Sequence, residues 1–75
     1  MNESLKVKAA ELKLAASRKR ILAASQRMYA QAHIRTGEKT GREICFEKGN
    51  QFAAFAERSE AEADLLVAQA EALLV

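Results

Sequence analysis

Residues 9–30 read AAELKLAASRKRILAASQRMYA and carry the pattern that decides the fold. Alanine recurs here every seven residues, at Ala9, Ala16, Ala23 and Ala30. The second half of the chain repeats this spacing in two series, Ala54, Ala61 and Ala68, and Ala56, Ala63 and Ala70. A sustained period of seven is typical of helices that pack almost side by side. Alanine at the repeat lets the two backbones come close, so the pattern predicts tightly packed helices.

The composition agrees with an all-α fold. The 75 residues suffice for one domain, residues 1–75, and include sixteen alanines, three glycines and no proline. A core of this size rarely supplies more than about 3–5 kcal/mol, and the single cysteine, Cys45, cannot form an internal disulfide. Self-association is the remaining common source of stability. The lone cysteine, with no signal-peptide core and no membrane-span candidate, leads us to expect a cytoplasmic protein.

Local signals predict two helices joined by one turn. The first helix is expected over about 4–36, capped by Asn2 or Ser4 and ended by Gly37. The turn is expected at 37–40. Thr40-Gly41-Arg42-Glu43 matches a capping box, in which the Thr40 hydroxyl accepts from the Glu43 amide and the Glu43 carboxylate reaches back to Thr40. The second helix is expected over about 41–74, which predicts an antiparallel hairpin with nearly equal arms.

Gly49-Asn50 is the weak point of the second helix, since an interior glycine costs about 1 kcal/mol. Two interpretations remain open. The glycine is tolerated at a crowded helix contact, or the helix breaks there into a short piece and a longer one.

Each helix has two apolar stripes on a helical wheel. In the first helix one stripe holds large residues, and the opposite stripe is rich in alanine; the large residues are Val7, Leu14, Ile21 and Met28, with Leu22 and Tyr29 beside them. The main stripe of the second helix contains Cys45, Phe52, Phe55, Ala56, Ala63, Leu66, Ala70 and Leu73. A second stripe needs a second partner, so we predict that two hairpins assemble as a dimeric four-helix bundle. A complex with another protein would serve equally well.

We assign the oligomer interface to the alanine-bearing stripes of both helices. Its expected residues are Ala9, Leu12, Ala16, Ala23, Ala30, Ala54, Ala61, Leu65 and Ala68.

The two halves carry opposite charge. Residues 1–42 contain ten basic and three acidic residues, a net charge of +7, and residues 43–75 contain two basic and seven acidic residues, a net charge of −5. If the chain folds about residues 38 and 39, three pairs come level: Lys6 with Glu71, Lys13 with Asp64, and Arg20 with Glu57. Such charges select orientation and partner in coiled coils. The alternative is a basic surface for nucleic acid, with Arg18, Lys19, Arg35 and Lys39 as candidate contacts.

No residue pattern indicates catalysis, a cofactor, a metal site or a small-molecule substrate. His33 is alone near the end of the first helix, where it is expected to cap carbonyls or face solvent. Cys45 falls on the main apolar stripe, which favours a packing role. The sequence therefore predicts a non-enzymatic interaction module that binds itself and a further protein, as an adaptor or regulator. The alternatives are a nucleic-acid-binding regulator and a purely structural oligomerisation piece.

Overall fold

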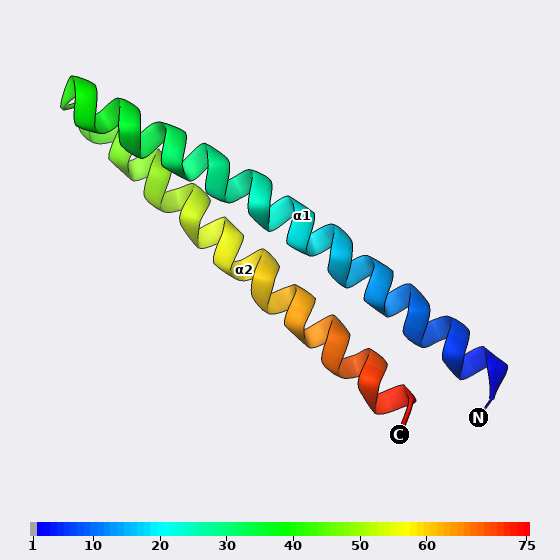
Figure 1. Cartoon of the computed structure of the whole chain (residues 1–75). Coiled ribbons are helices and arrows are strands. Elements are labelled where there is room, and N and C mark those ends of the chain that lie inside the picture. The colour runs from blue at the N-terminus through cyan, green and yellow to red at the C-terminus, as the bar shows by residue number, and fades with distance from the viewer. Residues whose placement is uncertain (1) are drawn as a thin grey trace.

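The chain forms an antiparallel hairpin of two long helices in the computed structural model, which describes residues 2–75 (Figure 1). Helix α1 spans Glu3–Thr40 and α2 spans Glu43–Leu73. The Cα atoms extend over 58 × 13 × 11 Å, so the molecule is a rod about one helix pair thick. The predicted all-α helical hairpin is confirmed.

The turn lies at Gly41-Arg42, so the prediction that it lies at 37–40 is wrong. α1 continues through Gly37 to Thr40, and Gly41 takes the left-handed conformation that ends the helix, with φ of 71°. The Gly41 amide donates to the Gly37 carbonyl at 2.7 Å. Glycine adopts this conformation without the steric cost that a Cβ imposes, which is why the second of the two glycines sets the end of α1.

The predicted capping box is also wrong. The Thr40 hydroxyl donates to the Thr36 carbonyl at 2.8 Å and accepts from the Arg42 amide at 3.4 Å. Arg42 is the residue that precedes α2, and its side chain makes no capping hydrogen bond. Because Thr40 is the last helical residue of α1, its hydroxyl bonds within that helix and turn. At the other end of α1 the expected cap is present, since the Asn2 side chain accepts from the Ser4 amide at 2.8 Å.

Small residues form the contact between the helices, and all of them except Ser59 recur at every seventh position. The buried set is Ala9, Ala16, Ala23, Ala30 and Gly37 from α1, with Gly49, Ala56, Ser59, Ala63 and Ala70 from α2. The Ser59 hydroxyl is satisfied by the Gln26 side-chain oxygen at 2.9 Å. Among the described residues no large side chain is fully buried. The hairpin is therefore held by close backbone approach more than by a thick apolar core.

Two glycines mark the tightest approach. α2 is unbroken through Gly49-Asn50, which settles the open question in favour of a glycine at a crowded contact. A Cβ on Gly49 would lie 2.5 Å from Ile34 Cδ1 and 3.1 Å from the Ala30 carbonyl oxygen. A Cβ on Gly37 would lie 2.9 Å from the Phe46 ring. Both glycines thus make room for a neighbouring side chain, and Gly37 does so inside a helix that it was expected to end.

Larger side chains flank this contact on one side. The Phe52 ring centroid lies 5.5 Å from that of Tyr29 and 6.0 Å from that of Phe55. The His33 ring stacks on Phe52 at 5.6 Å with an interplanar angle of 6°. His33 therefore packs against an aromatic ring and is half-buried, in place of the expected carbonyl cap or solvent position. The main stripe predicted for α2 is buried or half-buried at every position, Cys45 included.

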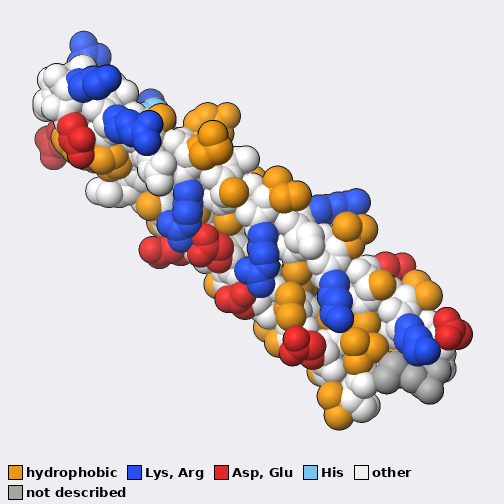
Figure 2. Space-filling view, viewed as in Figure 1, with side chains coloured by type: hydrophobic (Ala, Val, Ile, Leu, Met, Phe, Trp, Pro, Cys, Tyr) orange, Lys and Arg blue, Asp and Glu red, His pale blue; other side chains and the backbone are white. Residues whose placement is uncertain are grey.

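The other side of the contact carries basic side chains along α1 beside acidic ones along α2 (Figure 2). Arg20 pairs with Asp64 at 3.0 Å, whereas the expected partner was Glu57. Arg27 makes a two-point contact with Glu60, with hydrogen bonds of 2.7 and 3.0 Å. The predicted register is wrong because the turn centre lies about three residues later than expected, which shifts each partner along α2.

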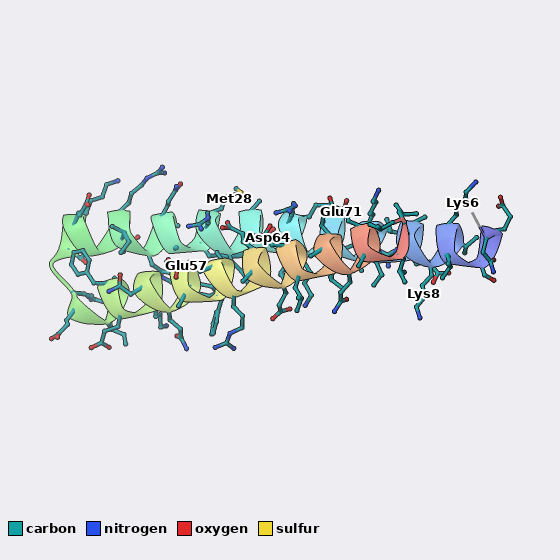
Figure 3. All side chains as sticks on the ribbon, turned by 90° about the horizontal axis from the view of Figure 1, so that it is seen from below. Lys6, Lys8, Met28, Glu57, Asp64 and Glu71 are labelled. Carbon is teal, nitrogen blue, oxygen red and sulfur yellow. The ribbon has the colours of Figure 1, made fainter. Side chains whose placement is uncertain are left out.

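The shift also leaves the start of α1 extending beyond the end of α2 (Figure 3). Lys6 lies on this overhang and pairs with Glu3 of its own helix at 3.6 Å, so the expected pair with Glu71 does not form. Lys13 makes no ion pair with Asp64, whose carboxylate bonds to Arg20.

Candidate protein-binding face

A row of large apolar side chains covers the side of α1 that is turned away from α2. Val7, Leu14, Ile21 and Met28 are 53–71% exposed and recur every seven residues. We call them the outer stripe. Each lies two positions before a buried alanine, and two residues correspond to about 200° of helical rotation. Met28 accordingly projects away from α2 (Figure 3). Leu22 and Tyr29, 45% and 59% exposed, widen the apolar surface at mid-helix.

The alanines of α1 lie on the opposite side from this stripe. Ala9, Ala16, Ala23 and Ala30 are 2–7% exposed because α2 of the same chain covers them. They have almost no surface left for a second molecule, so their assignment to an oligomer interface is corrected to the core of the hairpin. Leu12 is half-buried at the edge of the same contact. The physical reason is size, since only small residues at the seam allow the close approach seen at Gly49.

The α2 residues assigned to the interface are on the surface. Ala54, Ala61, Leu65 and Ala68 are all exposed, and Leu65 is the only large side chain among them. This outer face of α2 is therefore accessible, but its side chains carry much less apolar volume than those of the outer stripe of α1.

Small residues separate the large ones on the outer face of α1. Ala10, Ser17 and Ala24 each follow an outer-stripe residue by three positions, and all are exposed. A small residue thus follows each large one after three positions, and the next large one follows after four, which is the spacing of a coiled-coil seam. A shallow hollow of about 290 Å³ lies on the same helix, lined by Ser25, Met28, Tyr29 and Ala32. The surface is thus ridged, with knobs and recesses at helical spacing.

Charges near the helix contact are engaged within the hairpin. The hydrogen bond from Arg27 lowers the pKa of the Glu60 carboxyl below its usual 4.5, and Glu60 in turn raises the pKa of Arg27. The Lys19 ammonium, 2.7 Å from Glu62, likewise lowers the pKa of that carboxyl. All four side chains remain 40–45% exposed, so water and salt weaken these pairs. They set the alignment of the helices more than their stability.

One of the four candidate nucleic-acid contacts is engaged in an ion pair within the described part of the hairpin, and the other three are not. Lys19 is held by Glu62, so it does not belong to a free basic surface. Arg18, Arg35 and Lys39 are exposed and form no ion pair within residues 2–75. They lie on the outer side of α1, but Arg18 is separated by more than four helical turns from the pair nearer the turn.

A second depression of about 460 Å³ lies beside Gly49. It is lined by Arg27, Ala30, Gln31, Ile34, Arg35, Glu38, Gly49, Asn50 and Ala53. Across the part of the chain that the structure describes, no three His, Cys, Asp or Glu side chains gather as metal ligands. In the same residues no helix is both long and apolar enough to cross a membrane.

The fold and this surface define a two-helix hairpin with an apolar outer face. Comparisons of the chain with protein-family models, with curated proteins and with solved structures give no match.

Proposed function

We propose that the protein is a non-enzymatic helical interaction module of the cytoplasm, acting as an adaptor or regulator. Its outer stripe on α1 binds another protein surface, and the hairpins assemble as a dimer of four helices. The observation that carries this proposal is the exposure of Val7, Leu14, Ile21 and Met28 in one continuous row. Full burial of one such side chain contributes about 1.5–3 kcal/mol, so burial of the row in an interface would strongly favour binding.

The thin core of the hairpin supports the same conclusion. Among residues 2–75 the buried positions hold alanine, glycine and serine, while most large aliphatic side chains of α1 face water and Leu12 and Ile34 are half-buried. A two-helix hairpin of this size has little apolar burial to offset the ordering of its chain. Contact through the outer stripe would add the missing burial. Regularly spaced apolar residues on a long helix are also the usual means by which helices recognise other helices.

Photo-crosslinking in the producing cell tests the proposal. A photoreactive amino acid replaces Ala24, which lies within the outer stripe, and in a matched variant replaces Gln51, which is exposed on α2. We expect protein adducts from position 24 that an added Ile21→Lys substitution removes, and few adducts from position 51. Equal labelling of both positions, or adducts to nucleic acid alone, would contradict a protein-binding role for this face. The second outcome would favour the alternative of a nucleic-acid-binding regulator.

A further inference from the structure

We infer that the occupant of the outer stripe is a second copy of this chain, with the two α1 helices antiparallel and centred near residues 14–17. This inference rests on the proposed function and specifies its partner, orientation and register. Three features of the outer face carry it: the periodicity of its large residues, the small residues between them, and two charges at its edge.

The periodicity fits a helix lying along α1. The outer stripe runs from Val7 to Met28, which at 1.5 Å per residue is about 32 Å of continuous contact line. Residues that repeat every seven positions stay on one line only against another helix wound gently around the first. The stripe therefore matches a long helix, and α1 is itself such a helix with the same stripe. In a two-fold pair every contact is made twice.

The alternation of large and small residues favours the antiparallel orientation. When two α1 helices run in opposite directions, Leu14 lies level with Ser17 of the other copy, and Ile21 with Ala10. Val7 then meets Ala24, so these three large side chains each enter a recess made by a small one, and Met28, the fourth residue of the stripe, lies level with Glu3. In a parallel pair, each residue would lie level with the same residue of the other copy. Layers of paired alanine or serine would then leave gaps between layers of paired large residues, which forfeits packing energy.

Two charges fix the register. Glu11 and Arg18 lie along one edge of the stripe, seven residues apart, and neither forms an ion pair within residues 2–75. In the antiparallel register above, Glu11 of one copy lies about two residues, or roughly 3 Å, along the axis from Arg18 of the other, which is within reach of their side chains, and the two-fold axis produces this pair twice. The opposite edge carries four basic residues: Arg20 and Arg27 are bonded to acidic residues of α2, Lys6 is paired with Glu3, and Lys13 forms no ion pair within residues 2–75. Three of the four basic residues on the edge that would repel are thus paired with acidic side chains, and the charges of Glu11 and Arg18 on the other edge remain available for a second copy.

Site-directed disulfide formation tests the orientation in the full-length protein. In a Cys45→Ser background, Val7→Cys and Ala24→Cys chains are prepared separately and mixed under mild oxidation. We expect the mixed disulfide to dominate, because these two positions share a layer only in the antiparallel pair. Disulfides that instead form within each single preparation would establish the parallel orientation and overturn the inference. Circular dichroism of each variant verifies that the hairpin remains folded.

Charge reversal tests the register independently of cysteines. Glu11→Arg and Arg18→Glu should each weaken self-association about tenfold, because each places two like pairs across the dimer. Chains that carry both changes should recover to within about threefold, and a mixture of the two single variants should form a heterodimer. Glu47→Arg, an exposed change on α2, is the matched control and should leave association unchanged.

The outcomes separate this inference from the proposed function. Light scattering that shows an 8.3 kDa monomer at all concentrations, together with photo-adducts from position 24 to other proteins, would overturn self-pairing and leave the interaction module standing. If a dimer forms but neither Glu11→Arg nor Arg18→Glu alters its dissociation constant, the contact lies on another surface and the inference is wrong. Absence of any protein adduct at position 24 would contradict the proposed function itself.

Discussion

Replacement of Gly49 by alanine tests whether the helices approach as closely as described. Two effects oppose each other. Alanine in a helix interior is about 1 kcal/mol more favourable than glycine, so an unhindered site would gain stability. At this site the new Cβ would lie 2.5 Å from Ile34 Cδ1, 2.8 Å from Ile34 Cγ1 and 3.1 Å from the Ala30 carbonyl oxygen. The first two contacts demand movement of a side chain, and the third involves backbone.

The steric effect should win. Insertion of a methyl group into a filled contact costs about 1–3 kcal/mol, and the backbone contact places this site in the upper part of that range. After subtraction of the helix-propensity gain, Gly49→Ala should lower the free energy of unfolding by roughly 1–2 kcal/mol. Ile34→Val removes the nearest atom, Cδ1, so the double variant should lose less than the sum of the two single losses.

Urea unfolding followed by helical circular dichroism measures these differences, at one fixed protein concentration because self-association would add to stability. Gly41→Ala is the matched control. Its Cβ would meet nothing within 4 Å, but its φ of 71° disfavours any side chain. It should cost about 1–2 kcal/mol through the backbone alone, and Ile34→Val should not relieve it. Stabilisation by Gly49→Ala, or equal relief of both glycine variants, would refute the close contact.

Three further outcomes follow from the same structure. Ala16→Leu should destabilise the hairpin by about 1–3 kcal/mol because α2 covers the site, whereas Ala61→Leu at an exposed site should change unfolding by less than about 0.5 kcal/mol in denaturant titrations. Because the pKa of Glu60 is lowered in the folded protein, its ion pair with Arg27 adds to the free energy of unfolding above pH 4.5, and this contribution is lost as the pH falls through the folded pKa. The free energy of unfolding of Glu60→Gln, measured by acid titration, should therefore fall less steeply below pH 4.5 than that of wild type. Exchange of the charges at Arg20 and Asp64 should restore stability lost by either single reversal, and failure of that rescue at low salt would contradict the observed pairing.

The sequence by itself determined that the chain is two long helices. Sixteen alanines, no proline and a seven-residue apolar period leave no competing secondary structure. The cap at Asn2 and the main stripe of α2 were also predictable, because both depend on residues close together along the chain. The two apolar sides of α1 were visible as periodic rows, so the candidate face was within reach of sequence reasoning.

Only the tertiary structure decided which row lies inside. Both rows of α1 have the same period, and hydrophobicity alone favours burial of the larger side chains. The structure buries the alanines, because two glycine-containing helices can approach closely only where side chains are small. Close packing of the helices also explains why the turn lies at Gly41-Arg42 and not at 37–40 as predicted. Gly37 carries a local stop signal, but it packs against Phe46, and the left-handed position passes to Gly41. A glycine that ends a helix and one that admits a neighbour are identical in sequence, and only the packed partner distinguishes them.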